Sequence, residues 1–124
     1  MPKSIQDLTD IVCAFADERG WANNDPNQLI SSILIELGEL AEHYQWKSRF
    51  PEFDKQKKLE VGYEFVDILF YLLQLAAKSG IDIEAAFDSK LPKLHAKFPV
   101  GQTDEEFERT KEEYRRTGKN KLYS

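Results

Sequence analysis

Residues 55–78, KQKKLEVGYEFVDILFYLLQLAAK, decide the fold expected of this protein. When successive residues are placed about 100° apart, as on a helix, apolar side chains cover most of the circumference of this segment. A helix that is apolar nearly all round is typical of a buried helix. Polar side chains are confined to one narrow stripe, formed by Glu60, Glu64, Asp67, Tyr71, Gln74 and Lys78. The segment therefore predicts a buried helix that carries several carboxylates.

Helix signals also occur on both sides of this segment, and no strand pattern competes with them. Asp25 is a suitable N-cap and Pro26 suits the first position of a helix that should run to Trp46. Pro92 lies inside the fourth helix and should kink or interrupt it. The expected helices span residues 4–20, 25–46, 55–78, 82–97 and 104–116.

The length of 124 residues suits one compact helical domain followed by a tail. We expect an all-α protein, with a four-helix bundle in residues 1–100 and an additional helix in a C-terminal tail of residues 101–124. On the second helix, Ile35 points away from the main apolar face, which indicates a contact with another subunit.

Two pairs of acidic residues predict a metal site. Glu36 and Glu39 are neighbours on the second helix, and Glu64 and Asp67 are neighbours on the third, because residues three apart lie on one helix face. Partial burial makes the repulsion between like charges stronger, and no Lys or Arg follows these acids at the next turn. A divalent cation would compensate the charge. Oxygen ligands favour Mg²⁺, with Mn²⁺ possible, whereas His43 is more typical of a helix surface and is left out of the ligand set.

Composition argues against several classes of protein. The net charge of −5 gives no excess of cations for a nucleic-acid partner. The apolar run at residues 68–77 is too short to span a membrane, and the N-terminus lacks the pattern of a signal peptide. The lone Cys13 cannot form an internal disulfide, which favours a reducing compartment, and we expect a cytoplasmic protein.

Three strings of the sequence resemble a known family. They are ELGELAE at residues 36–42, YQW at 44–46 and EFVDILFY at 64–71. Their arrangement is similar to the signature of the MazG-like nucleoside triphosphate pyrophosphohydrolases, which is Glu-x-x-Glu, a spacer and then Glu-x-x-Asp. The resemblance extends over about residues 15–99 and is greatest to the short single-domain members, including the dCTP pyrophosphatases.

The resemblance implies an α-helical bundle that assembles as a homodimer or homotetramer. It implies Mg²⁺-dependent hydrolysis of a nucleoside triphosphate to a nucleoside monophosphate and pyrophosphate, in house-cleaning of the nucleotide pool. The family often has Asn at the position of Leu94, where its amide holds the base or sugar. Residues that match family positions are the metal ligands Glu36, Glu39, Glu64 and Asp67, the base-binding Trp21 and Trp46, and the phosphate-binding Tyr71, Lys90 and Lys97.

Glu39 is the candidate catalytic residue, which would orient the attacking water or accept its proton, and Glu60 or Glu42 could share this task. The substrate could be a normal nucleotide, a damaged nucleotide or an alarmone. The competing hypothesis is a regulatory helical module that binds nucleotides or proteins without turnover. Converging acids favour the enzyme, because a binding surface does not require them.

Overall fold

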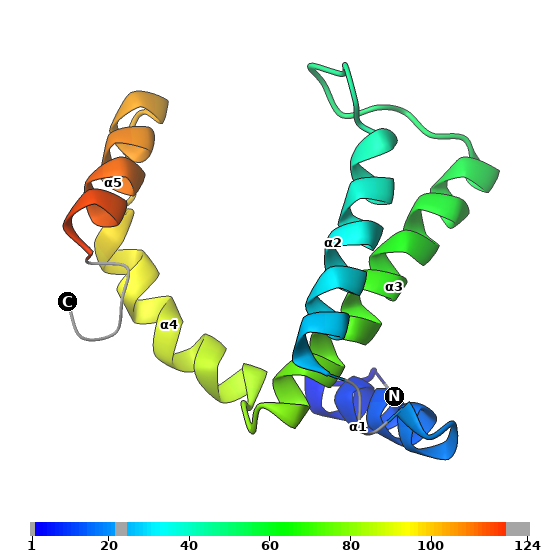
Figure 1. The fold of residues 1–124 in the computed structure, drawn as a ribbon. Helices are drawn as coiled ribbons and strands as arrows, with labels where there is room; N and C mark the ends of the chain where they lie inside the picture. Colours follow the sequence, from blue (N-terminus) through cyan, green and yellow to red (C-terminus); the bar gives the residue numbers. More distant parts are fainter. Residues whose placement is uncertain (1, 22–24, 119–124) are drawn as a thin grey trace. The chain divides into compact units, whose positions relative to one another are not determined.

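The computed structural model describes residues 2–21 and 25–118, and the described chain is all-α as expected (Figure 1). No strand occurs in these residues. The helices are α1 (Ile5–Glu18), α2 (Pro26–Glu42), α3 (Lys55–Lys78), α4 (Ile83–Lys97) and α5 (Asp104–Thr117).

Side-chain caps begin four of these helices. Ser4 and Asp7 form a reciprocal capping box on α1, and the Asp25 carboxylate accepts a hydrogen bond from the Asn27 N–H at 2.7 Å. Asp54 caps α3 in the same way, through the Lys57 N–H. Each cap satisfies an amide that the helix itself leaves without an acceptor.

The second helix is shorter than expected. It ends at Glu42, with His43 as its C-cap, and does not reach Trp46. Trp46 has a φ of 66°, in the left-handed region, so its backbone cannot continue a right-handed helix. An edge contact between the rings of Tyr44 and Phe53, with centroids 5.6 Å apart, joins the turn after α2 to the residue before the cap of α3.

The internal contacts of the chain divide it into two compact units, residues 1–83 and residues 84–124. This boundary lies at the start of α4, whereas the sequence suggested a division between residues 100 and 101. Pro92 does not interrupt α4, which continues through it to Lys97. Within the described part of the chain, no helix is long and apolar enough to cross a membrane.

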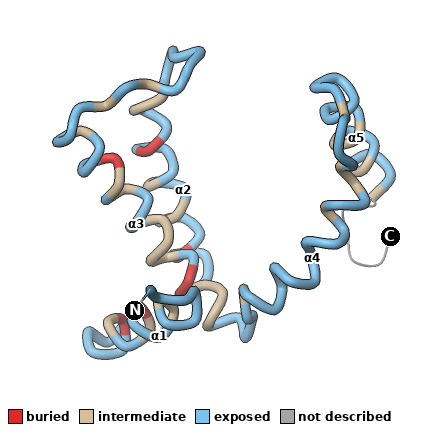
Figure 2. Tube along the Cα trace, turned by 180° about the vertical axis from the view of Figure 1, so that it is seen from behind, coloured by how far each residue is buried: buried red, intermediate tan, exposed pale blue. Residues whose placement is uncertain are grey.

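In the first unit, α2 and α3 lie side by side and antiparallel, and α1 packs against α3 (Figure 1). The buried positions are few and lie on these three helices (Figure 2). Leu29 and Leu40 are buried on α2, Val61 and Leu73 are buried on α3, and Ala16 belongs to the buried side of α1. The buried apolar residues are Val12, Ala16, Leu29, Leu40, Val61 and Leu73.

The prediction that the third helix is buried is wrong for the single chain. Within residues 1–83, only α1 and α2 make substantial contacts with α3, so they cover one side of it. Tyr63 and Phe65 of α3 are more than half exposed. The same holds for α2, whose buried face includes half-buried Glu36 while Leu34 and Ile35 are exposed. We define the outer apolar surface as the exposed side chains Ile30, Leu34, Ile35 and Leu37 of α2 and Leu59, Tyr63, Phe65, Val66 and Leu72 of α3.

The second unit contains α4 and α5, and the additional C-terminal helix is confirmed over Asp104–Thr117. Thr103 caps it through the Glu106 N–H, and Gly118 follows in the left-handed conformation that commonly ends a helix. The rings of Phe98 and Phe107, with centroids 4.6 Å apart, join the end of α4 to α5. Residues 119–124 of the predicted tail lie outside the described residues.

Candidate metal centre

The two acidic pairs occupy adjacent positions on α2 and α3. Glu36 and Glu64 are half-buried between the two helices, because each lies on the face that its helix turns toward the other. Glu39 and Asp67 are exposed. One acid of each pair therefore lies in the helix interface, and the other lies toward solvent.

The electrostatics of Glu36 show that the four carboxylates interact. Burial raises the pKa of Glu36 above its ordinary value of 4.5, and the negative charges of Glu39, Asp67 and Glu64 raise it further. Glu39 is also close enough to accept a hydrogen bond from the protonated Glu36 carboxyl. The structure thus brings all four predicted ligands into one electrostatic cluster.

A buried oxygen of this cluster has no hydrogen-bond donor. Oε2 of Glu36 is buried and accepts no hydrogen bond, whereas Oε2 of Glu64, also buried, has Nε2 of His43 2.6 Å away. Buried carboxylate oxygens without donors are costly, and a hard divalent cation is a partner that oxygen atoms of this kind favour. The donor set therefore fits Mg²⁺ or Mn²⁺.

The side chains do not yet converge on one point. Among the described residues, no three His, Cys, Asp or Glu side chains are gathered closely enough to hold a metal ion as they stand. Carboxylates repel one another, so close convergence requires a positive charge between them. The ligand assignment of Glu36, Glu39, Glu64 and Asp67 stays a prediction.

His43, which the sequence did not favour as a ligand, contacts one of the four predicted ligands. Its Nε2 lies 2.6 Å from Oε2 of Glu64, and the two side chains are 15% and 21% exposed. A signal for this was present in the sequence. His43 follows Glu39 by one turn and Glu36 by two turns, so it shares their side of the helix.

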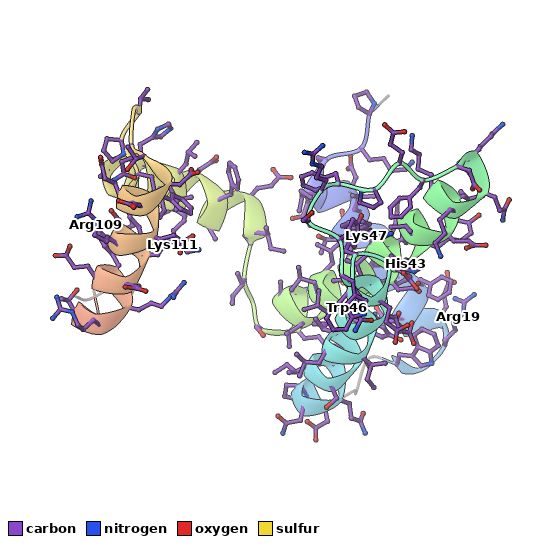
Figure 3. The ribbon with its side chains drawn as sticks, turned by 90° about the horizontal axis from the view of Figure 1, so that it is seen from above. Arg19, His43, Trp46, Lys47, Arg109 and Lys111 are labelled. Atoms are coloured by element: carbon purple, nitrogen blue, oxygen red, sulfur yellow. The ribbon has the colours of Figure 1, made fainter. Side chains whose placement is uncertain are left out.

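The two tryptophans differ in their surroundings. Trp46, labelled in Figure 3, is 93% exposed and lies just beyond the end of α2, three residues after His43. Trp21 is 40% exposed and follows α1. Its ring makes an edge contact with the ring of Phe15, with centroids 5.7 Å apart. Its carbonyl oxygen accepts a hydrogen bond from Lys78 at 2.9 Å. Trp46 therefore offers a free aromatic face, whereas Trp21 is held in place.

The other predicted substrate residues fall in both units. Tyr71 is half-buried on α3, one turn after Asp67. Lys90 is exposed on α4, and Lys97 lies at the end of that helix, with its Nζ 4.6 Å from the centre of the Tyr114 ring. Partial desolvation lowers the pKa of Lys97, as do the positive charges of Lys90, Arg115 and Lys111. Lys90 and Lys97 are thus near each other, and their place relative to the carboxylates stays a prediction.

Comparison with known proteins identifies related sequences. Residues 12–124 match the family model described as dUTPase. The chain is 32% identical to the dCTP pyrophosphatase 1 of Rattus norvegicus over 102 residues, and 31% identical to that of Homo sapiens over 102 residues. These matches cover 78% of this chain and 60% of each relative, so the chain spans less than two thirds of their length.

A solved structure shows the same fold. The crystal structure of a pyrophosphatase from Archaeoglobus fulgidus aligns with a TM-score of 0.59 and 31% identity, over 80% of this chain and 95% of that one. The resemblance seen in the motifs of α2 and α3 is therefore confirmed. From this match and the family model, the chain belongs to the all-α dUTPase family, which is MazG-like.

Proposed function

We propose that this protein hydrolyses a nucleoside triphosphate to the nucleoside monophosphate and pyrophosphate, with Mg²⁺ as cofactor. The observation that carries the proposal is the cluster of Glu36, Glu39, Glu64 and Asp67, in which three neighbouring carboxylates raise the pKa of the fourth. Such a concentration of negative charge costs stability without a cation. Its presence on paired helices of this family supports a metal-dependent hydrolase.

The residues of the cluster would divide the work. Mg²⁺ bound there would neutralise charge on the triphosphate and on the leaving pyrophosphate. Glu36 and Glu64 would be the ligands nearer the interface of the two helices, because their half-buried carboxylates have less freedom to move than exposed ones. Glu39 is exposed beside them and would orient the attacking water and accept its proton.

The nucleotide would be held by aromatic and basic side chains. Trp46 has the exposed ring that stacking on a base requires, and Trp21 would give a second aromatic contact. Tyr71, Lys90 and Lys97 would bind the phosphates. The relatives are named for dCTP and the family model for dUTP, so deoxypyrimidine triphosphates are the first substrates to test.

We also propose that the protein forms homo-oligomers and is located in the cytoplasm. The outer apolar surface supports a homodimer or homotetramer, since a second copy could cover it. The absence of a membrane-crossing helix from the described residues, together with the single cysteine of the chain, supports a place in the cytoplasm.

Pyrophosphate release from a panel of nucleotides tests the activity. The panel should contain dCTP, dUTP, the other canonical triphosphates, damaged nucleotides and an alarmone, each with Mg²⁺ and with EDTA. We expect release that EDTA abolishes. No turnover of any nucleotide, together with nucleotide binding, would instead favour the regulatory module.

Matched substitutions test the site. Glu39→Gln and Asp67→Asn keep the size of the side chain and remove one charge, and we expect each to lower kcat by about 10²–10³-fold. Glu52→Gln, at an exposed position in the segment between α2 and α3, serves as the control. Full activity of Glu39→Gln and Asp67→Asn in excess Mg²⁺ would refute the site assignment.

A further inference from the structure

The contact between His43 and Glu64 links the end of α2 to the middle of α3. Nε2 of His43 and Oε2 of Glu64 are 2.6 Å apart, and both side chains are largely shielded from water. The two residues come from different helices, so the contact depends on the packing of α2 against α3. An exposed ion pair contributes little, but a shielded one restricts both side chains.

The contact concerns one oxygen of Glu64 and not the other. Oε2 is buried and accepts no hydrogen bond of ordinary angle, although Nε2 of His43 lies beside it. The imidazole is thus in electrostatic contact with this oxygen. A neutral imidazole donates from one nitrogen, so it can order a carboxylate without placing a fixed positive charge beside a cation.

We propose that His43 is a positioning residue for the metal centre, which holds Glu64 through Oε2 and leaves Oε1 as the oxygen that binds the cation. The inference rests on the proposed function, because it assigns a role toward the metal of that site. Groups that hold a metal ligand in place typically contribute 10–100-fold to metal affinity. They do so because the ligand loses less rotational freedom when the metal binds.

A direct bond from His43 to the metal is the competing interpretation. Imidazole suits Zn²⁺, Cu²⁺ or Fe²⁺ better than Mg²⁺. The described residues contain no set of three ligand side chains that already includes His43, whereas its contact with the Glu64 carboxylate is formed. The structure therefore favours positioning over ligation.

Binding of Mn²⁺ without nucleotide tests the inference. Electron paramagnetic resonance of free Mn²⁺ gives the dissociation constant for the intact chain and for four variants. His43→Gln places an amide nitrogen near the position of Nε2. His43→Leu has no donor, and the side chain of His43→Asn is too short to bring its amide nitrogen to that position. His95→Gln changes the only other histidine, which lies on α4 in the second unit, and is the control.

We expect His43→Leu and His43→Asn to weaken Mn²⁺ binding by about 10–100-fold. His43→Gln should stay within about threefold of the intact chain, since it keeps the donor, and His95→Gln should not differ from it. If His43→Leu does not fold, His43→Asn still measures the effect of losing the donor at the position of Nε2. Thermal unfolding of the metal-free variants separates a loss of folded protein from a loss of affinity.

Three outcomes would overturn the inference. Unchanged affinity in His43→Leu and His43→Asn, with hydrolysis by the intact chain preserved, would refute it and leave the proposed function standing. Equal losses in the Gln, Leu and Asn variants, with nitrogen coupling to Mn²⁺ in pulsed spectra of the intact chain, would make His43 a ligand. Absence of both Mn²⁺ binding and hydrolysis in the intact chain would refute the metal centre and this inference together.

Discussion

At the scale of single residues, Glu36 has an ordinary position on a helix and an unusual electrostatic setting. Its pKa is raised in the folded protein by burial and by three neighbouring carboxylates. The unfolded chain therefore releases this proton at a lower pH than the folded protein does. As pH rises from about 4.5 through the native pKa of Glu36, the free energy of unfolding falls, and the loss persists at higher pH.

This sign gives a prediction for Glu36→Gln, which removes the charge and keeps the helix propensity. In EDTA at about pH 8, the variant should unfold a few degrees above the intact chain, and near pH 4 the difference should vanish. Circular dichroism during heating measures both. Exposed Glu42→Gln should stay within about 0.5 kcal/mol at either pH. A Glu36→Gln variant that is less stable at about pH 8 would contradict the assigned electrostatics.

Trp46 combines a strained backbone with an exposed ring. Its φ of 66° is uncommon for a bulky residue, and its side chain is 93% exposed. We expect Trp46→Gly to leave the melting temperature unchanged or higher, because little burial is lost and the left-handed conformation suits glycine. If the ring stacks on the base, KM should rise by about tenfold or more. Thermal unfolding and steady-state kinetics check the two parts, and an unchanged KM would remove Trp46 from the site.

Residue types and spacing predict which acids lie beside each other on one helix, and His43 shows what they do not predict. The spacing of three placed Glu36 beside Glu39 and Glu64 beside Asp67, and the structure brings the pairs together. His43 was missed because a histidine at a helix end is usually a surface residue. Only the pairing of α2 with α3 shows that it meets Glu64. Contacts between distant segments depend on packing, which a single helical wheel does not contain.

At the scale of elements, the ends of helices were predicted less well than their existence. The cap at Asp25 is a local signal, and its prediction is confirmed. The end of α2 depends on the backbone conformation of Trp46, which no residue type indicates. The buried face of α2 also departs from hydrophobicity alone, because it includes half-buried Glu36 while Leu34 is exposed.

The bond from Lys78 of α3 to the carbonyl oxygen of Trp21 links two elements that are distant in sequence. We expect Lys78→Met to cost about 1 kcal/mol of stability and to loosen the segment that carries Trp21. Acrylamide quenching of Trp21 fluorescence, measured with Trp46→Phe in the background, should increase. Lys58→Met, a change at an exposed lysine of the same helix, should leave quenching unchanged. Equal quenching in both variants would show that the bond does not hold Trp21.

At the scale of the whole molecule, packing within one chain buries only part of the apolar surface of α3. The all-α class and the C-terminal helix followed from periodicity and caps. The expected burial of α3 was wrong, since among the helices of the first unit only α1 and α2 make substantial contacts with it. The contacts also divide the chain after Ile83, which no composition change marks. The burial of a helix depends on how many other helices pack on it, so it cannot be predicted from the sequence of that helix alone.

The outer apolar surface predicts association. Ile35 of this surface is 63% exposed on α2, and Ile35→Glu should shift the molecule toward the monomer. Sedimentation velocity over a range of concentrations measures the change. Val100→Glu, at an isolated exposed position in the second unit, should leave the sedimentation coefficient unaltered. A monomeric intact chain at all concentrations would contradict the prediction.

The hairpin of α2 and α3 places carboxylates between its helices and apolar side chains on its outside. A helix pair built in this way is poorly stabilised by its own packing, because the buried side contains repelling charges. If a second copy covers the outside, dilution would weaken the fold and the metal site at the same time. Loss of activity on dilution, with recovery on adding Mg²⁺ or on reconcentration, would then be a thermodynamic property of the hairpin itself.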